Sequence, residues 1–421
     1  MKEKHISTES YKGVRDFYPE DARIQQYIFE TWARTAESFG FERYDASILE
    51  PSALYKAKGA ENEEMVNEQT YTFTDRGDRE VTLRPEMTPT IARMVAAKQR
   101  ELSLPLRWYS IPNLFRYERQ QKGRLREHWQ LNCDIFGSDH ITSDIEIIAL
   151  ANQTLINFGL SSDQFVISIN DRALMERMYK AIGLNQNQII DLTRLNDRRN
   201  KISFTDYKTQ LNKITNDGTL DEEIILLLDK SDEQTDVIIG LEELGITNVT
   251  FDKSLARGFD YYTGTIFEAF ALDDEGKPTG RSLLGGGRYD DLTKLFNQES
   301  VSGIGFGMGD VTLKDLLVEK DLIPKSVKQT GTDLIIIPMS AEQNLEAQKI
   351  ALELRTCQLS VMTDLSTRKV AKKFNDATKN GAKYAIVLGK SEIETGKLTL
   401  KNLHNDDETT GYIEQIKLKL K

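Results

Sequence analysis

The amino-acid sequence predicts an α+β protein. Its core is expected to be built on an antiparallel sheet with flanking helices and a helical insertion, and a C-terminal α/β domain follows. Apolar, strand-like runs on both sides of a basic loop near residue 120 predict the antiparallel sheet. Residues from about 171 to 245 are charged and poor in aromatic side chains, with apolar residues at helical spacing, which indicates the insertion. Strand and helix patterns alternate from residue 332 onward, which is typical of βαβ units and a mainly parallel sheet. We place the core in residues 1–322 and the second domain in residues 330–421, with a charged linker between them at 319–330.

The composition indicates an ordinary folded protein of two or three domains. The 421 residues carry a formal net charge of −11 at pH 7, which argues against nonspecific, charge-driven binding of nucleic acid but leaves room for local basic patches. The two cysteines lie far apart and the four histidines are scattered, so we expect no disulfide framework and no metal bound by protein side chains. No apolar run approaches the roughly 20 residues that span a bilayer, and we expect a cytoplasmic protein.

The N-terminal elements follow from apolar spacing and turn residues. We predict a helix with one buried face, then a strand, then a hairpin, at 21–38, at 44–49, and at 71–75 with 80–83. The run Leu-Arg-Pro-Glu-Met-Thr-Pro (83–89) next delivers Glu86 and Thr88 in front of a helix. Thr88 before a proline is a good N-cap, so a capping role is the alternative to a binding role for this run.

The stretch 115–130 carries five cations within eleven residues, with Lys-Gly at its middle. Strand patterns at 106–111 and 129–136 flank it. Guanidinium groups clamp oxyanions, so a mobile basic loop between antiparallel strands could hold phosphates. From these residues alone, a solvated surface hairpin remains the alternative. The cations are Arg116, Arg119, Lys122, Arg124 and Arg126.

Further candidates lie on both sides of the insertion, which itself carries no chemistry that we can identify. A helix at 143–158 and a strand at 165–170 precede it. In 254–270, an Arg, an Asp and a Tyr pair stand before an alternating strand pattern; they suit a site for an anion and an imidazole, or an edge strand with an Arg–Asp ion pair. The glycine triplet 285–287 permits close backbone approach to a ligand or a bulge, and 303–309 alternates glycine with apolar residues ahead of a helix.

The second domain is predicted to alternate strands with amphipathic helices. The strands are expected at 332–338, 359–363 and 384–388, and the helices at 341–355 and 367–381. The second of these helices carries a basic cluster that could contact RNA phosphates, although a basic helix face is more often only solvated. The cluster consists of Arg368, Lys369, Lys372 and Lys373.

Several of these motifs resemble those of the histidyl-tRNA synthetases, a family of class II aminoacyl-tRNA synthetases. Phe-Arg-x-Glu-Arg, a loop and Arg-x-x-x-x-x-Gln (115–130) are similar to the second class II motif, and 303–309 to the third. The Leu-Arg-Pro-Glu-Met-Thr run (83–88) resembles the Leu-Arg-Pro-Glu-Gly-Thr segment of the bacterial enzymes. Arg-Gly-Phe-Asp-Tyr-Tyr (257–262) and Gly-Gly-Gly-Arg-Tyr-Asp (285–290) are similar to the two motifs that are specific to this family.

The resemblance covers nearly the whole chain and implies a reaction. Histidine and ATP would give histidyl-adenylate, and histidine would then pass to the 3′ end of tRNA(His). ATP with Mg²⁺, histidine and tRNA(His) would be the partners, in a homodimer whose C-terminal domain binds the anticodon. Two alternatives remain: a synthetase-like regulatory subunit of ATP phosphoribosyltransferase, which binds histidine as an effector, and another class II synthetase.

The resemblance also implies roles for residues at matching positions. Arg116 and Arg257 would be catalytic, opposing each other across the α-phosphate. The residues expected to bind histidine are Glu86, Met87, Thr88, Arg116, Gln130, Asp134, Arg257, Tyr261, Tyr262 and Tyr289. Those expected to bind ATP are Arg116, Glu118, Arg124, Arg126 and His128. Those expected to bind tRNA are Gln121, Lys122, Arg368, Lys369 and Lys372.

The sequence departs from the family pattern at positions that matter for the site. His128 replaces the usual Phe against adenine, which predicts weaker or pH-sensitive stacking, and Asp134 replaces the more frequent Glu. Thr312 stands where the third class II motif normally ends in the arginine that binds the γ-phosphate, so we expect Arg124, Arg126 or Mg²⁺ to balance that charge. Asp310 is expected to cap the helix that follows, and Lys314 to point away from the site.

Overall fold

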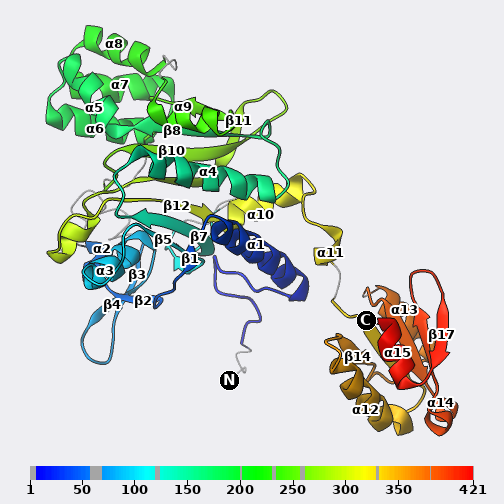
Figure 1. Cartoon of the computed structure of the whole chain (residues 1–421). Coiled ribbons are helices and arrows are strands. Elements are labelled where there is room, and N and C mark those ends of the chain that lie inside the picture. The colour runs from blue at the N-terminus through cyan, green and yellow to red at the C-terminus, as the bar shows by residue number, and fades with distance from the viewer. Residues whose placement is uncertain are drawn as a thin grey trace, which may run out of the picture. The chain divides into compact units, whose positions relative to one another are not determined.

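A computed structural model of the chain describes residues 6–56, 69–118, 124–199, 202–229, 234–256, 261–328, 331–379 and 381–420. The chain divides into two compact units, Met1–Leu322 and Ile323–Lys421 (Figure 1). Over the part of the chain that the structure describes, every helix is too short or too polar to cross a membrane.

The first unit is organised around one large sheet, which has nine strands in the described residues. Neighbouring strands are antiparallel except at the two edges, where β1 pairs with β5 and β8 with β9 in parallel. This confirms the predicted antiparallel core. In spatial order the strands are β1 (Glu42–Arg43), β5 (Leu106–Ser110), β7 (Glu127–Phe136), β12 (Gly303–Gly309), β11 (Pro278–Arg288), β10 (Thr265–Leu272), β8 (Phe165–Asp171) and β9 (Val249–Phe251), and β6 (Asn113–Phe115) also pairs with β7.

Three helices cover one face of this sheet: α1 (Pro19–Ser38), α4 (Ile141–Asn157) and α10 (Asp310–Glu319) (Figure 1). Apolar side chains from α1 and the sheet meet here, and the fully buried Trp32 ring donates its Nε1–H to Met308 Sδ at 3.0 Å. Side chains alternate between the two faces of a strand, so alternate residues of β7 pack under these helices and the others face the opposite side. That opposite side carries the candidate site.

On the other face lie a small sheet and shorter helices. The prediction of one strand at 44–49 is wrong, because the chain pairs at β1, turns, and pairs again at β2. The buried Arg84 guanidinium holds the turn by donating to the carbonyl oxygens of Ala46 and Ser47. The N-cap role, given above as the alternative to binding, does not hold for Thr88, because Thr88 is already the first helical residue, after Met87. The elements are β2 (Leu49–Pro51), α2 (Ala53–Lys56), the predicted hairpin β3 (Tyr71–Thr74) and β4 (Glu80–Leu83), α3 (Thr88–Lys98) and η4 (Leu292–Phe296).

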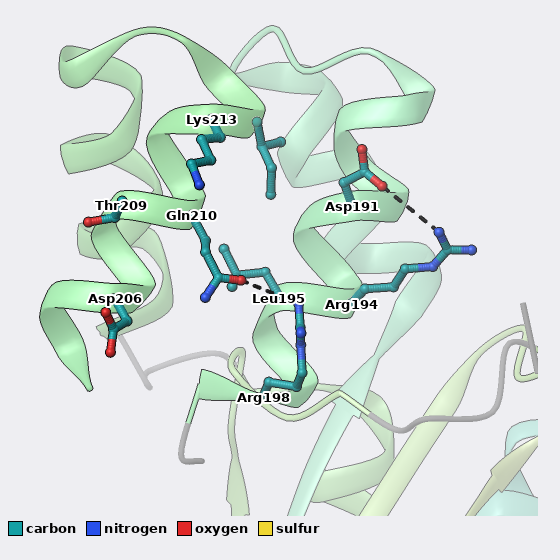
Figure 2. Close-up of a pocket in the computed structure, with 9 residues that line it drawn as sticks. Asp191, Arg194, Leu195, Arg198, Asp206, Thr209, Gln210 and Lys213 are labelled. Atoms are coloured by element: carbon teal, nitrogen blue, oxygen red, sulfur yellow. Dashed lines mark hydrogen bonds and ion pairs between the residues drawn. The ribbon is translucent and has the colours of Figure 1, made fainter. Parts of the chain in front are cut away.

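The insertion is helical, as its periodicity predicts. Its apolar core includes Tyr179, Leu192 and Tyr207, and α9 packs against α4. A polar hollow lies between α6 and α7, where Arg198 reaches Gln210 and Arg194 faces Asp191 (Figure 2). The helices are α5 (Arg172–Ala181), α6 (Gln186–Asp197), α7 (Phe204–Thr215), α8 (Gly218–Asp229) and α9 (Asp236–Glu243).

The second unit is a mixed sheet with helices. The prediction of a mainly parallel sheet holds for β14, β13 and β15, which are parallel, and fails for β16 and β17, which continue the sheet antiparallel. Lys373 is buried beside Asp364 and donates to the Pro338 carbonyl, so it does not belong to a solvated basic face. The elements are α11 (Lys325–Lys328), β13 (Leu334–Pro338), η5 (Ala341–Gln343), α12 (Asn344–Arg355), β14 (Val361–Thr363), α13 (Val370–Lys379), β15 (Tyr384–Leu388), α14 (Lys390–Thr395), β16 (Leu398–Asn402), β17 (Glu408–Gly411) and α15 (Ile413–Leu420).

Candidate active site

Two adjoining cavities open on the sheet face opposite α1, α4 and α10. The larger has a volume of about 850 Å³ and the smaller about 40 Å³. Four residues line both: Arg116, Gln130, Gly285 and Gly307. A ligand in the larger cavity and a ligand in the smaller one would therefore meet at the Arg116 guanidinium.

Alternating glycines in β12 make room for the polar residues of β7. Gly305 pairs with Asp134, and a Cβ at Gly305 would lie 2.2 Å from Asp134 Oδ1. A Cβ at Gly307 would lie 2.6 Å from Gln130 Nε2. Both contacts are far too short for real atoms, so glycine at 305 and at 307 leaves the space that Asp134 and Gln130 occupy.

The smaller cavity is lined by acids and phenols. Asp134 is 4% exposed and accepts a hydrogen bond from the Tyr289 hydroxyl. Burial raises the pKa of Asp134 to about 7, although the Tyr289 hydrogen bond opposes this shift. The Tyr261 hydroxyl donates to Glu86 Oε2 at 3.3 Å, and Tyr262 and Thr88 complete the predicted set around the cavity. Seven of the residues predicted to bind histidine therefore line one small space together with Arg116.

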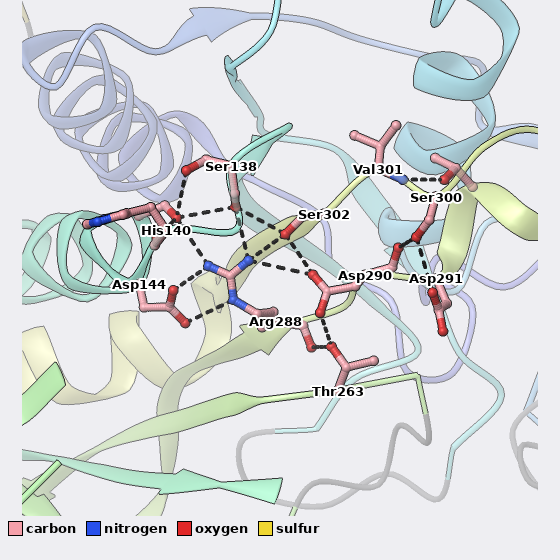
Figure 3. A network of polar contacts seen from close by, with 12 residues as sticks. Ser138, His140, Asp144, Thr263, Arg288, Asp290, Asp291, Ser300, Val301 and Ser302 are labelled. Carbon is pink, nitrogen blue, oxygen red and sulfur yellow. Dashed lines mark hydrogen bonds and ion pairs between the residues drawn. The ribbon is translucent and has the colours of Figure 1, made fainter. Parts of the chain in front are cut away.

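Arg288, from the Gly-Gly-Gly-Arg-Tyr-Asp motif, is not among the described residues that line either cavity, and we infer that it positions its neighbour Tyr289. Figure 3 shows the polar network around Arg288. Its guanidinium donates twice to Asp144, from Nε at 3.2 Å and from Nη2, and so ties the end of β11 to α4. Nη1 also donates to the Ser138 carbonyl at 3.0 Å and to Ser302 Oγ at 2.5 Å. This buried network fixes the backbone from which Tyr289 reaches Asp134.

Replacing Arg288 with lysine is expected to lower the free energy of unfolding by roughly 3 kcal/mol, because one ammonium cannot replace a fork with several fixed donors and leaves buried acceptors unpaired. Urea unfolding at neutral pH measures this loss. Arg194→Lys is the matched control: its 3.9 Å pair with Asp191 is half exposed, so a change below about 0.5 kcal/mol is expected. Equal, small losses in both variants would show that the network does not stabilise the fold.

Arg116 is held at the junction by its neighbours. Its Nε donates to the Pro85 carbonyl at 2.8 Å, and its backbone N–H donates to the Arg126 carbonyl at 2.9 Å. The first of these contacts ties the second class II motif to the Leu-Arg-Pro-Glu-Met-Thr run. A guanidinium anchored through Nε keeps its two terminal nitrogens for anions.

The larger cavity is lined by both acidic and basic residues. Glu118 pairs with Arg124, whose Nε lies 3.2 Å from Glu118 Oε2, and Thr312 and Arg281 line the same space. His128 also lines it, and burial together with the nearby Arg116 and Arg15 guanidinium groups lowers the pKa of His128 to about 3. The imidazole is therefore neutral throughout the physiological range, so the expectation of pH-sensitive stacking at His128 is not supported.

Two residues expected at the site face elsewhere. Arg126 is not among the described side chains that line either cavity: its guanidinium lies 3.9 Å from the Tyr117 ring centroid and donates to the Tyr11 hydroxyl at 3.2 Å. Met87 is 1% exposed, contacts the Arg84 guanidinium through its sulfur, and is not among the described residues that line the smaller cavity.

The start of α10 differs from the sequence prediction in one respect. Asp310 is not the N-cap, a position that Gly309 takes; the buried Asp310 carboxylate accepts instead from Arg15 at 2.7 Å and from the Trp129 backbone N–H at 2.9 Å. Lys314 does turn away from the site and pairs with Asp21 on α1 at 2.8 Å.

The remaining predicted site residues lie either outside the described residues or in the second unit. Arg257, Gln121 and Lys122 lie outside the described residues. In the second unit, Arg368 pairs with Asp376, and Lys369 and Lys372 are exposed.

Comparison with known families decides the identity. The family described as histidyl-tRNA synthetase matches residues 13–312, and the family described as anticodon binding domain matches residues 333–421. The chain belongs to the histidyl-tRNA synthetase family. As a member of this synthetase family, it is an enzyme that joins histidine to tRNA at the expense of ATP.

Individual members of the synthetase family match over nearly their whole length. The histidine–tRNA ligase of Leptospira biflexa is 40% identical, with 100% of this chain and 99% of the relative covered. That of Thermoplasma volcanium is 35% identical, with 96% of each chain covered. The crystal structure of the histidyl-tRNA synthetase from Nostoc sp. PCC 7120 superposes with a TM-score of 0.79 at 22% identity, over 99% of both chains, which shows the shared fold.

The residues that line the cavities of this synthetase without having been predicted include Asn132 in the smaller one, and Glu268 and Arg281 in the larger one. Asn132 follows Gln130 by two positions on β7, so alternation could have found it. Glu268 lies on β10 within the alternating strand pattern, and Arg281 lies near the start of β11. Neither belongs to a motif, and the pairing of strands far apart in the chain brings them to the site.

Proposed function

We propose that histidine binds in the smaller cavity, that ATP binds in the larger one, and that the two react at Arg116. One observation carries this proposal: the acid-and-phenol cavity and the larger cavity share Arg116 and Gln130. The histidine carboxylate attacks the α-phosphate, and pyrophosphate leaves. The negative charge that builds on the α-phosphate in the transition state lies against the Arg116 guanidinium, which stabilises it.

On the histidine side, we assign Asp134 to the imidazole N–H. Tyr289 donates to Asp134 and holds its carboxylate in place, and Tyr262 lines the same pocket. Glu86, with Thr88 and Gln130, takes the substrate ammonium, and the Tyr261 hydroxyl orients Glu86. Buried acceptors that a wrong side chain leaves unpaired cost free energy, so this arrangement selects histidine.

On the ATP side, Glu118 is assigned to the adenine amino group and the neutral His128 to the adenine face. Mg²⁺ arrives with ATP, and it takes oxygen ligands. Glu268 is a carboxylate that lines the ATP cavity and is of the type that such an ion binds. In the described ranges, no three His, Cys, Asp or Glu side chains converge as ligands of a resident metal.

The remaining assignments rest on the family resemblance. Arg257 opposes Arg116 across the α-phosphate, and Gln121 and Lys122 contact the acceptor end of tRNA(His). Arg368, Lys369 and Lys372 contact the anticodon stem and loop. The protein works as a homodimer in the cytoplasm.

ATP–pyrophosphate exchange, measured with each of the twenty amino acids, tests this function. Exchange is expected with histidine alone, and transfer of labelled histidine to tRNA(His) is expected in a second assay. Histidine binding without exchange would instead identify a regulatory subunit of the ATP phosphoribosyltransferase type. Exchange with another amino acid and not with histidine would reject the assignment of the smaller cavity.

A further inference from the structure

Three arginines among the described residues line the larger cavity: Arg116, Arg124 and Arg281. Arg116 also lines the smaller cavity, whereas Arg124 and Arg281 line only the larger one. If the α-phosphate lies at the junction, as the proposed function requires, the other two are the described arginines of this cavity that remain for the rest of the triphosphate.

Arg281 reaches this cavity because of how its strand ends. In the antiparallel pair of β11 and β12, Leu284 lies opposite Met308, and β12 ends one residue later at Gly309. The N-terminal part of β11 therefore continues beyond the end of β12, alongside the first turn of α10. Arg281 and Thr312 line the cavity from these two elements.

The electrostatics around Arg281 favour an anion, although Asp252 and Glu268 also line the larger cavity. Burial and the charge of Arg124 lower the pKa of Arg281, and the single carboxylate of Glu118 offsets this in part. A guanidinium group whose charge is disfavoured by a second guanidinium group is stabilised by an anion that contacts both. Thr312 carries no charge, so the first turn of α10 adds no cation to this cavity.

We propose that Arg281, together with Arg124, binds the β- and γ-phosphates of ATP and the pyrophosphate product. This proposal rests on the proposed function for the location of the α-phosphate. Arg281 takes the role that was predicted from the sequence for Arg126, whose guanidinium lies against the Tyr117 ring.

The test compares ATP, ADP and AMP binding by calorimetry, in the parent and in Arg281→Gln. ATP affinity is expected to fall about tenfold or more, because a charge-assisted hydrogen bond is lost, and AMP affinity should stay within about twofold. The affinity for ADP, which lacks the γ-phosphate, separates the contribution of the β-phosphate from that of the γ-phosphate. Equal losses for ATP and AMP, or no loss for ATP, would overturn the proposal.

Lys277→Gln is the matched control. Lys277 lies four positions away at the same end of the hairpin, is exposed, pairs with Glu275 and is not among the residues lining the cavity. Removing the same charge there should leave ATP affinity unchanged. Arg281→Lys keeps the charge but loses the guanidinium fork, so its ATP affinity should lie between those of the parent and Arg281→Gln. It is also the test variant if Arg281→Gln does not fold.

A rescue experiment asks whether the position or only the charge matters. Thr312→Arg, added to Arg281→Gln, is expected to restore most of the lost ATP affinity, because Thr312 and Arg281 line the same cavity. No rescue together with an unchanged AMP affinity would restrict the role to Arg281 itself. Failure of the proposed function looks different: the parent would then make no histidyl-adenylate, whereas the ratio of ATP to AMP affinity would still report on Arg281.

Discussion

Replacing Arg116 with alanine is expected to lower the rate of histidyl-adenylate formation by at least about a hundredfold. The guanidinium lies where the two cavities meet, and its contribution grows as charge builds on the α-phosphate. The loss should therefore appear mainly in kcat, with a smaller change in KM for histidine, because histidine is held largely by the acids and phenols of its own cavity. Single-turnover adenylate formation, followed with radiolabelled ATP, measures the rate directly.

Two further variants separate catalysis from folding in this experiment. Arg116→Lys keeps the charge but cannot both donate to the Pro85 carbonyl and bind an anion with two nitrogens, so it should recover only a small part of the rate. Arg43→Ala removes an exposed arginine from β1, away from both cavities, and should leave the rate unchanged. A rate for Arg116→Ala within about threefold of the parent would place the reaction elsewhere.

The sequence predicted the core because local patterns and pairing agree there. In β7, residues on one face pack under helices and those on the other enter the cavities. The alternation of side chains and the presence of polar site residues therefore both predict a strand at this position. The family motifs then located Asp134, Tyr289 and Arg116 at one place, although they are far apart in the chain. Local periodicity was also sufficient for α1, α4 and the insertion.

The errors occurred where distant contacts override local pattern. The single strand predicted at 44–49 splits because Arg84, some forty residues later, binds the carbonyl oxygens of Ala46 and Ser47. Asp310 looked like a helix cap in the sequence, but Arg15, nearly three hundred residues away, takes its carboxylate. Distant contacts also decide which arginines reach the site. The position of Arg126 next to the basic loop led to its prediction as an ATP-binding residue, whereas strand pairing brings Arg281 into the cavity.

The pKa of Asp134 predicts a trade between stability and function. The folded-state pKa is about 7, above the ordinary value of 3.8, so between these pH values the folded protein keeps a proton that the unfolded chain has released. Stability from this group is therefore present at low pH and is lost as the pH rises toward 7. Asp134→Asn cannot titrate, so it does not lose this stability as the pH rises. The free energy of unfolding of the variant minus that of the parent should therefore be larger at pH 8 than at pH 5, by roughly 2 to 3 kcal/mol.

Urea unfolding of both proteins at the two pH values measures this difference, and other titrating groups cancel in the comparison. Asp139→Asn, at an exposed position shortly after β7, should follow the parent at both pH values. If the difference between Asp134→Asn and the parent does not change with pH, the carboxyl group has an ordinary pKa and is not desolvated as the structure indicates.

The same Asp134→Asn variant should lose function where it gains stability. At pH 8 the parent presents a buried carboxylate to the imidazole N–H, and a hydrogen bond to a charged acceptor is worth roughly 1.5 to 3 kcal/mol, so kcat/KM for histidine should fall by about 10- to 100-fold. At pH 6 the parent's Asp134 is itself mostly protonated, so its kcat/KM falls toward that of the variant and the ratio between the two shrinks. A substitution that only disturbed packing would give the same ratio at both pH values. Exchange assays with histidine at pH 6 and pH 8 therefore distinguish a charged acceptor from a shape effect, and a constant ratio would remove Asp134 from the role proposed for it.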